Sequence, residues 1–288
     1  MTKIPVQQTI AEAYRFTFAG LGNVIGLIWL PIVLLTVGRY FVAADAAISD
    51  PENVNLQGPV IVRGLAFDLI AVLLFAVMAV AIARDILKPR QRPALLRFSL
   101  GLEEFRVAGG YVGLFFLMVV FVIGLFLAAM VAAAAGKIAG GSVIAGALAG
   151  AVVLAGLGAL VFVLVRLSFL LVPGAALEGG FGLETSWKLT RGNFWRIVVI
   201  DVATLLPVTV VALIAALVVL GPDIAQLKFT LASDPVERAR QMAALMRVIL
   251  SHQPVLLGIS FVLAPFTYGL SMSPPAFAYR ALTGAAAK

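Results

Sequence analysis

Tryptophans and cations are concentrated in one short stretch of this chain, LETSWKLTRGNFWRIVVI, which runs from residue 183 to residue 200 between two long apolar segments. Lysine and arginine donate hydrogen bonds to phosphate oxygens, and tryptophan rings favour the boundary between lipid and water. The pattern therefore predicts a surface that binds anionic lipid headgroups on the cytoplasmic side of a membrane. The residues that we expect to form this surface are Trp187, Lys188, Arg191, Trp195 and Arg196. A plain amphipathic linker without any ligand explains the same pattern.

A second group of candidate residues consists of charges within the apolar segments, where ionisable side chains usually have a function or a partner. Arg166 and Asp201 fall at similar depth, so the two could pair. Asp68 could in the same way meet Arg63 or Arg39. Structural ion pairs, or side chains that extend to the nearby interface, explain these charges without an ion path, because neither acid is placed at the centre of its segment.

The composition excludes several kinds of catalytic and metal site. The chain contains no cysteine and a single histidine, His252, so thiol chemistry, thiolate metal sites and histidine clusters are ruled out. The sequence also lacks a phosphate-binding glycine loop, metal-ligand spacing and a nucleophile elbow. We therefore expect no catalytic residue, no metal and no cofactor. The net charge of +7 indicates attraction to anionic lipid rather than to nucleic acid.

Six apolar segments predict the framework that positions these residues. Of the 288 residues, 62% are hydrophobic and 12% are charged, which is about half the charged share of an ordinary soluble domain. Each segment exceeds the roughly 20 residues that cross a hydrocarbon core. Backbone groups in lipid require a helix or a closed barrel, and these segments do not alternate as barrel strands do. We predict an all-α, polytopic membrane helical bundle forming a single domain, with spans at about 21–41, 59–86, 107–134, 142–172, 194–220 and 254–279.

The distribution of basic residues predicts the orientation of the spans. With the N-terminus in the cytoplasm, fourteen of the 21 lysines and arginines fall on the cytoplasmic side and seven on the other. This excess favours a multi-pass protein of the bacterial inner membrane with both termini cytoplasmic. A long charged stretch precedes the first apolar segment and Arg39 interrupts it, so we expect a retained span rather than a cleaved signal peptide.

Short amphipathic segments precede the first, third and fifth spans, with apolar residues at steps of three and four. We predict interfacial helices at about 5–18, 94–105 and 183–191, and an outer amphipathic helix at about 234–251. The order suggests three copies of one unit, a surface helix followed by two spans, although any loop that enters a membrane tends to be amphipathic. Gly146 and Gly150 form a GxxxG pair, which predicts close helix packing within the chain or between chains.

The segment ALEGGFGLETSWKLTRGNFWRI, residues 176–197, resembles the pattern of the bacterial glycerophosphodiester-phosphodiesterase membrane-domain family and its uncharacterised relatives. That pattern has an acidic–glycine turn, a serine–tryptophan pair, a leucine, a basic–glycine pair and an aromatic–arginine pair. The matching residues are Glu178, Gly179, Ser186, Trp187, Leu189, Arg191, Gly192, Phe194, Trp195 and Arg196. After the last span, SPPAFAYRAL has the aromatic Tyr279 but lacks the acidic residue that such families often place there. The resemblance implies a six-helix membrane module, and no catalytic residue carries over.

Three hypotheses for the function follow from these observations. The first is a non-enzymatic membrane module that organises or senses lipid, or that assembles with a protein partner or with copies of itself. The second is a transporter or permease for a small or lipid-like solute, which the repeated units, the proline-interrupted spans and the candidate Arg166–Asp201 pair favour. The third, an intramembrane phosphodiesterase that acts on lipid, rests only on the family name. The first explains the aromatic and cationic stretch most directly.

Overall fold

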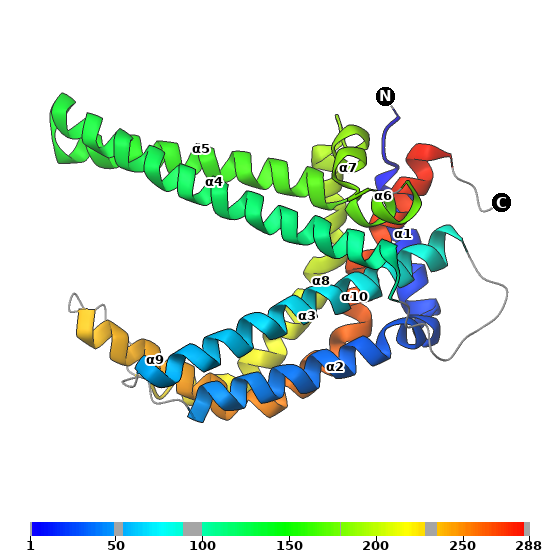
Figure 1. Cartoon of the computed structure of the whole chain (residues 1–288), viewed down its shortest axis with the longest axis horizontal. Coiled ribbons are helices and arrows are strands. Elements are labelled where there is room, and N and C mark those ends of the chain that lie inside the picture. Colours follow the sequence, from blue (N-terminus) through cyan, green and yellow to red (C-terminus); the bar gives the residue numbers. More distant parts are fainter. Residues whose placement is uncertain (1, 49–53, 89–99, 179, 228–234, 285–288) are drawn as a thin grey trace.

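The computed structural model of the chain describes residues 2–48, 54–88, 100–178, 180–227 and 235–284. Within these ranges every regular element is a helix, so the predicted all-α, polytopic bundle is confirmed (Figure 1). Six helical segments are long and apolar enough to cross a membrane. The chain is therefore a multi-pass membrane protein.

The helices divide into long and short elements. The long ones are α2 (Leu21–Ile48), α3 (Val54–Leu87), α4 (Leu102–Gly140), α5 (Ser142–Ser168), α8 (Phe194–Ile224) and α10 (Gln253–Thr283). The shorter ones are α1 (Val6–Tyr14), the π-helical segment η1 (Arg15–Ala19), α6 (Leu171–Leu177), α7 (Leu183–Leu189) and α9 (Pro235–Ser251).

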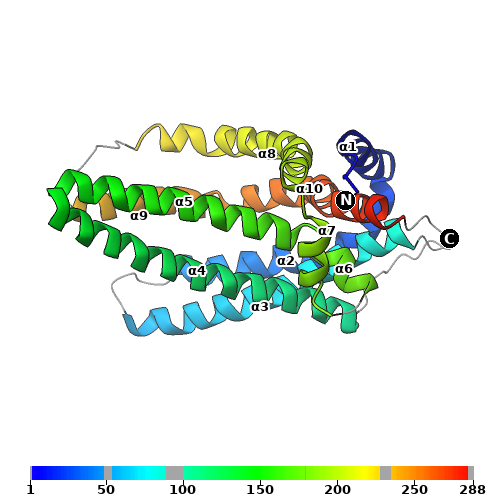
Figure 2. The same cartoon turned by 90° about the horizontal axis from the view of Figure 1, so that it is seen from above.

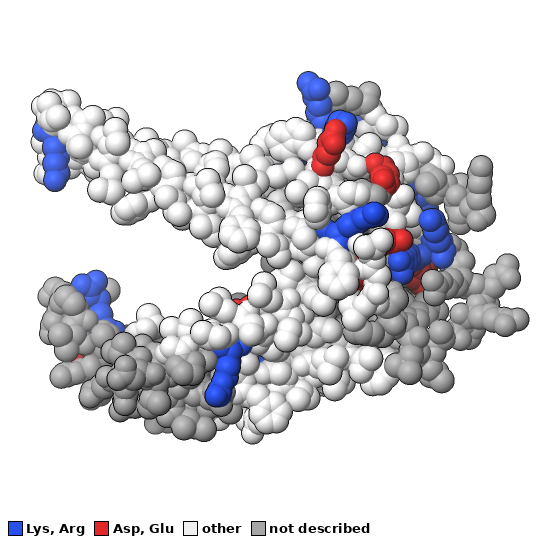
Figure 3. Space-filling model, in the orientation of Figure 1, with Lys and Arg blue, Asp and Glu red and all other residues white. Residues whose placement is uncertain are grey.

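The long helices form two arms that diverge from one end of the molecule (Figures 1 and 2). One arm is the hairpin of α4 and α5, and the other contains α2, α3, α8, α9 and α10. The two chain ends lie with α1, α6 and α7 where the arms meet, and we call this end the base (Figure 1). The space-filling view shows an open space between the arms, while most coloured charges on this face gather over the base (Figure 3).

The surfaces of α4, α5 and α8 are apolar on nearly all sides. In the most apolar window of each of these segments, 6% of the residues are buried within the protein. Large side chains such as Phe126 on α4, Leu154 on α5 and Val218 on α8 are more than half exposed. Water contact would cost about 25 cal/mol for each Å² of such surface, so these helices require a lipid environment.

The hairpin of α4 and α5 packs through glycines other than the predicted pair. A Cβ atom on Gly136 would lie 2.5 Å from Cα of Ala145, and Gly156 faces the side chain of Leu125. By contrast, a Cβ atom on Gly146 or Gly150 would meet no described atom within 4 Å. The GxxxG pair therefore makes no close contact within the described chain, which leaves packing between chains as its remaining interpretation.

The predicted interfacial helix at 5–18 is formed by α1 and η1, and it packs against α8 and α10. Its buried side carries Thr9, Ala13 and Thr17. The hydroxyl of Tyr14 donates a hydrogen bond of 2.9 Å to a backbone carbonyl of α8. The segment is thus part of the base of the bundle, since its buried face contacts protein.

The threefold repeat remains a prediction. Residues 94–99 of the second predicted interfacial helix lie outside the described residues, and α4 begins at Leu102. Short helices followed by two long ones occur in α1–η1–α2–α3 and again in α6–α7–α8–α10, where α9 separates the last two.

Candidate functional site

The predicted span at 142–172 is interrupted, because α5 ends before residue 169 and α6 begins at residue 171. Pro173 contributes to the break, since its nitrogen has no hydrogen to donate to the helical ladder. The hydroxyl of Ser186 contributes more directly. It accepts a hydrogen bond of 3.0 Å from the Leu170 amide and donates one of 2.6 Å to the Arg166 carbonyl. A side chain thus replaces the helical bond between these two residues and joins α7 to the break.

The side chain of Arg166 lies against α7 and is only 7% exposed. Its Nη2 atom donates a hydrogen bond of 2.6 Å to the carbonyl of Trp187, and its Nε atom donates one of 3.3 Å to Oγ1 of Thr190. The guanidinium carbon also lies 3.7 Å from the ring centroid of Trp187 and 5.3 Å from that of Phe162. A carbonyl, a hydroxyl and two aromatic faces therefore surround this cation.

Arg166, Ser186, Trp187 and Thr190 form a compact group that we call the Arg166 cluster. Ser186 and Thr190 are fully buried, and the Thr190 hydroxyl donates a hydrogen bond of 2.7 Å to the Ser186 carbonyl. An isolated helix of seven residues, such as α7, is unstable in water. The cluster therefore fixes the position of α7. In the sequence, the cluster is marked by two hydroxyl residues four positions apart, Ser186 and Thr190. The amphipathic pattern alone did not identify this pair.

The charge pairs considered from the sequence are not formed among the described side chains. The Arg166 guanidinium contacts α7, whereas Asp201 lies half-buried on α8 with no ion pair to it. On α3, Arg63 and Asp68 are both exposed, and Asp68 pairs with neither Arg63 nor Arg39. Arg63 and Asp68 are five residues apart on α3, so their side chains leave the helix in directions about 140° apart.

The exposed side of α7 and the first turn of α8 carries most of the residues expected to bind headgroups. Trp195 is 75% exposed and Trp187 is 39% exposed. Lys188 and Arg191 are also exposed. We call these four residues the headgroup surface. The Arg166 guanidinium holds α7 through the backbone carbonyl of Trp187, and Trp195 lies on the first turn of α8.

Arg196 also makes a contact within the chain. Its Nη1 atom donates a hydrogen bond of 2.7 Å to the carbonyl of Ile4, and the Ile4 amide donates one of 3.1 Å to Oδ1 of Asn193. Asn193, which is 2% exposed, does not cap α8 with its side chain. Both side chains instead attach the N-terminal segment to the turn between α7 and α8, a contact between residues nearly 190 positions apart.

The ion pair of Glu184 and Lys188 lies on the outer side of α7, where Nζ of Lys188 is 2.5 Å from the carboxylate. This hydrogen bond lowers the pKa of Glu184 and raises the pKa of Lys188. Both groups therefore remain charged around neutral pH, and an anionic ligand must compete with Glu184 for Lys188.

Glu184→Gln is expected to strengthen the binding of anionic lipid at neutral pH, because it releases Lys188 from its acidic neighbour. The increase should be small, since the pair is exposed to solvent. For the wild type, binding should rise only when the pH falls below about 4.5, the ordinary pKa of glutamate, because the pKa of Glu184 is lowered. Native mass spectrometry of the anionic lipid retained by the purified protein across this pH range measures both effects, and weaker retention by the variant would contradict the assignment.

A carboxylate at the end of α6 joins three helices at the base. Glu178 accepts hydrogen bonds of 2.6 Å from the hydroxyls of Tyr279 and Thr185. Glu178 and Tyr279, which the sequence analysis singled out separately, therefore meet in space. The contacts of Glu178 tie α6 to α7 and α10.

The described residues contain no group of three or more histidine, cysteine, aspartate or glutamate side chains that could hold a metal ion. The arrangement at the base offers donors for anionic groups and aromatic rings for the lipid boundary. Comparisons of the chain with models of protein families, with curated proteins and with solved structures give no match.

Proposed function

We propose that this chain is a non-enzymatic membrane module that binds anionic lipid headgroups at its headgroup surface, Trp187, Lys188, Arg191 and Trp195. The observation that carries the proposal is the exposure of two tryptophans and two cations along α7, the turn after it and the first turn of α8. The hydrogen bond from Arg166 to the Trp187 carbonyl holds α7 in place. Phosphate groups accept hydrogen bonds from such cations, and tryptophan rings settle at the depth of the headgroups.

Arg191 is the principal cation of the proposed site. Its guanidinium has no hydrogen-bond or ion-pair partner among the described residues, so the full set of guanidinium donors is available to a phosphate. Lys188 forms an ion pair with Glu184, so it contributes less than Arg191 to the binding of a phosphate. Because contacts within the chain already hold α7 in place, little loss of conformational entropy is required when a headgroup binds.

The base faces the cytoplasm in this proposal. The excess of basic residues at this end supports that orientation, and the chemistry of the site fits the anionic lipids of a bacterial inner membrane. Arg196 supports the surface indirectly, because it anchors the N-terminal segment beside it.

A double variant, Lys188→Ala with Arg191→Ala, tests the proposal. In native mass spectrometry of protein extracted with its own lipids, we expect the ratio of anionic to zwitterionic lipid bound to fall by about tenfold or more, since each cation near a membrane surface contributes about 1 kcal/mol. The matched control is Arg15→Ala with Lys88→Ala, which removes the same charge from two exposed positions near the base. Equal ratios in the two variants would contradict the proposed site.

Transport of a lipid-like solute is a second candidate function, favoured by the opening between the arms (Figure 3). Prolines also lie inside three of the long helices, at Pro31, Pro207 and Pro265. Reconstituted vesicles that contain fluorescent phospholipid test this candidate, because a lipid transporter exposes the inner-leaflet label to a membrane-impermeant quencher. A rate equal to that of protein-free vesicles would remove support for it.

A further inference from the structure

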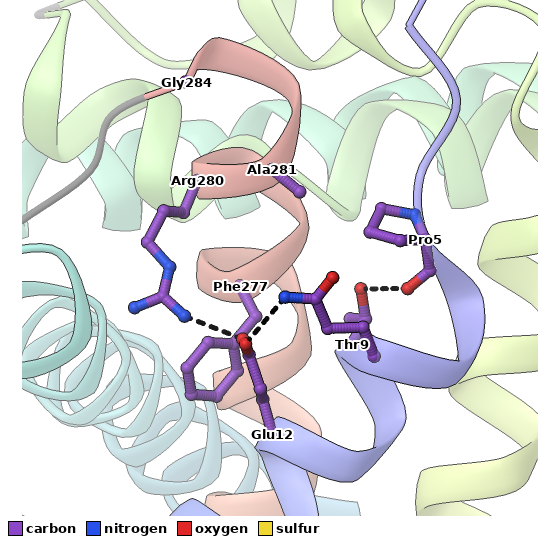
Figure 4. Close-up of a pocket in the computed structure, with 8 residues that line it drawn as sticks. Pro5, Thr9, Glu12, Phe277, Arg280, Ala281 and Gly284 are labelled. Carbon is purple, nitrogen blue, oxygen red and sulfur yellow. Dashed lines mark hydrogen bonds and ion pairs between the residues drawn. The ribbon is translucent and has the colours of Figure 1, made fainter.

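A cavity of about 320 Å³ lies at the base between α1 and the last turns of α10 (Figure 4). It is separate from the headgroup surface, since no residue of α7 or α8 lines it. Its volume is at the lower end of the range for small-molecule sites. The lining residues are Pro5, Gln8, Thr9, Glu12, Phe277, Arg280, Ala281 and Gly284.

An ion pair between Arg280 of α10 and Glu12 of α1 lines this cavity. Nη2 of Arg280 lies 2.7 Å from Oε2 of Glu12, and the side chains are 30% and 28% exposed. Nε2 of Gln8 donates a hydrogen bond of 3.0 Å to the other carboxylate oxygen. The Arg280 guanidinium also lies over the ring of Phe277, 5.1 Å from its centroid. Figure 4 shows the side chain of Arg280 on α10 meeting the carboxylate of Glu12 on α1.

Both charged groups retain hydrogen-bonding capacity that the described chain does not use. A guanidinium has five N–H donors, and among the described residues the guanidinium of Arg280 hydrogen-bonds only to Glu12. A carboxylate offers about four lone-pair sites, and the two described bonds, from Gln8 and Arg280, leave about half of them free. The cavity can therefore donate to an anion and accept from a cation at adjacent positions.

We propose that the cavity binds an amphoteric headgroup, a phosphate diester linked to a primary ammonium, as in phosphoethanolamine lipids. A phosphate would accept from Arg280, and the ammonium would donate to Glu12. An anion without an ammonium would meet the carboxylate of Glu12 as well as Arg280, and like charges at this range repel. A quaternary ammonium would lack the N–H groups that the carboxylate needs. Because the cavity carries one positive and one negative group, it favours a ligand that also carries both charges.

The test compares lipids that differ only in the headgroup. Native mass spectrometry of the full chain in nanodiscs with equal amounts of phosphatidylethanolamine, phosphatidylcholine and phosphatidylglycerol gives the lipid preference. We expect Glu12→Gln to reduce the ethanolamine-over-choline preference by about tenfold, the value of one charge-assisted hydrogen bond. Ala281→Phe should abolish the preference by filling the cavity while the Arg280–Glu12 pair remains intact. Thr283→Phe, on the opposite side of the last turn of α10, is the matched control and should leave the preference unchanged.

The outcomes separate this proposal from that for the headgroup surface. Loss of the ethanolamine preference in Ala281→Phe but not in Thr283→Phe supports the cavity, and it does so even if Glu12→Gln fails to fold. An unchanged preference in Ala281→Phe overturns the proposal, whatever happens to anionic lipid in the Lys188–Arg191 double variant. Soluble glycerophosphoethanolamine distinguishes the ligand source: competition by this compound indicates that the headgroup alone suffices, and no competition indicates that the site takes the intact lipid.

Discussion

Arg166→Ala is expected to lower the free energy of unfolding by about 3 kcal/mol or more, because it removes two hydrogen bonds from a charged donor and a stacked cation. The lost contacts are those with the Trp187 carbonyl, the Thr190 hydroxyl and the Trp187 ring. The carbonyl of Trp187 would also lose its guanidinium partner. Thermal unfolding in detergent, followed through tryptophan fluorescence, measures the effect, and the emission of Trp187 should change in the native state as its cation leaves.

Two further variants identify the cause of this effect. Arg166→Lys keeps the charge but not the planar group, so it should recover only part of the lost stability. Arg106→Ala is the matched control, because it removes a half-exposed arginine from the nearby start of α4. If Arg166→Ala and Arg106→Ala unfold at the same temperature, the Arg166 cluster does not hold α7.

Gly182→Ala is expected to destabilise the fold by about 3 kcal/mol, which combines the cost of a left-handed residue with that of a steric clash. The φ angle of Gly182 is +72°, and a Cβ atom there would lie 2.7 Å from the backbone nitrogen of Ala175. A Cβ atom there would also meet the carbonyl oxygen of Leu171. Neither contact can relax through a side-chain rotation, since both obstructing atoms belong to the α6 backbone. The unfolding temperature of the purified variant measures the loss.

Gly180 provides the comparison for this variant. Its φ angle is +67°, but a Cβ atom there would meet no described atom within 4 Å. Gly180→Ala should therefore cost only the conformational term, about 1 to 2 kcal/mol. Equal losses for the two variants would show that α6 and α7 are not packed as closely as the structure indicates.

The long helices could be predicted from the sequence because a membrane span is a local property. A run of about 20 apolar residues must form a helix in lipid whatever its neighbours are. The predicted starts at residues 21, 142 and 194 coincide with the first residues of α2, α5 and α8. Gly20, Gly141 and Asn193 precede these helices and mark their beginnings.

The contacts at the base could not be predicted in the same way, because they depend on tertiary packing. Arg166 finds its partners on α7, more than 20 residues away, and they are a carbonyl and a ring rather than an acid. The insertion of Ser186 at the α5–α6 break and the bond from Arg196 to Ile4 likewise have no signal in local periodicity. The ion pair of Glu184 and Lys188, by contrast, follows from helix spacing, since the two residues are four positions apart on α7.

Quenching of tryptophan fluorescence by brominated lipid tests the central claim most directly, since it reports contact between lipid and the headgroup surface. A chain with Trp29→Phe retains Trp187 and Trp195, the two tryptophans of that surface. In vesicles that contain equal mole fractions of lipid, we expect brominated phosphatidylglycerol to quench this fluorescence more strongly than brominated phosphatidylcholine. Adding Arg191→Ala should remove that difference. Equal quenching by the two lipids in the parent chain, or a difference that survives Arg191→Ala, would contradict the binding of anionic headgroups at this surface.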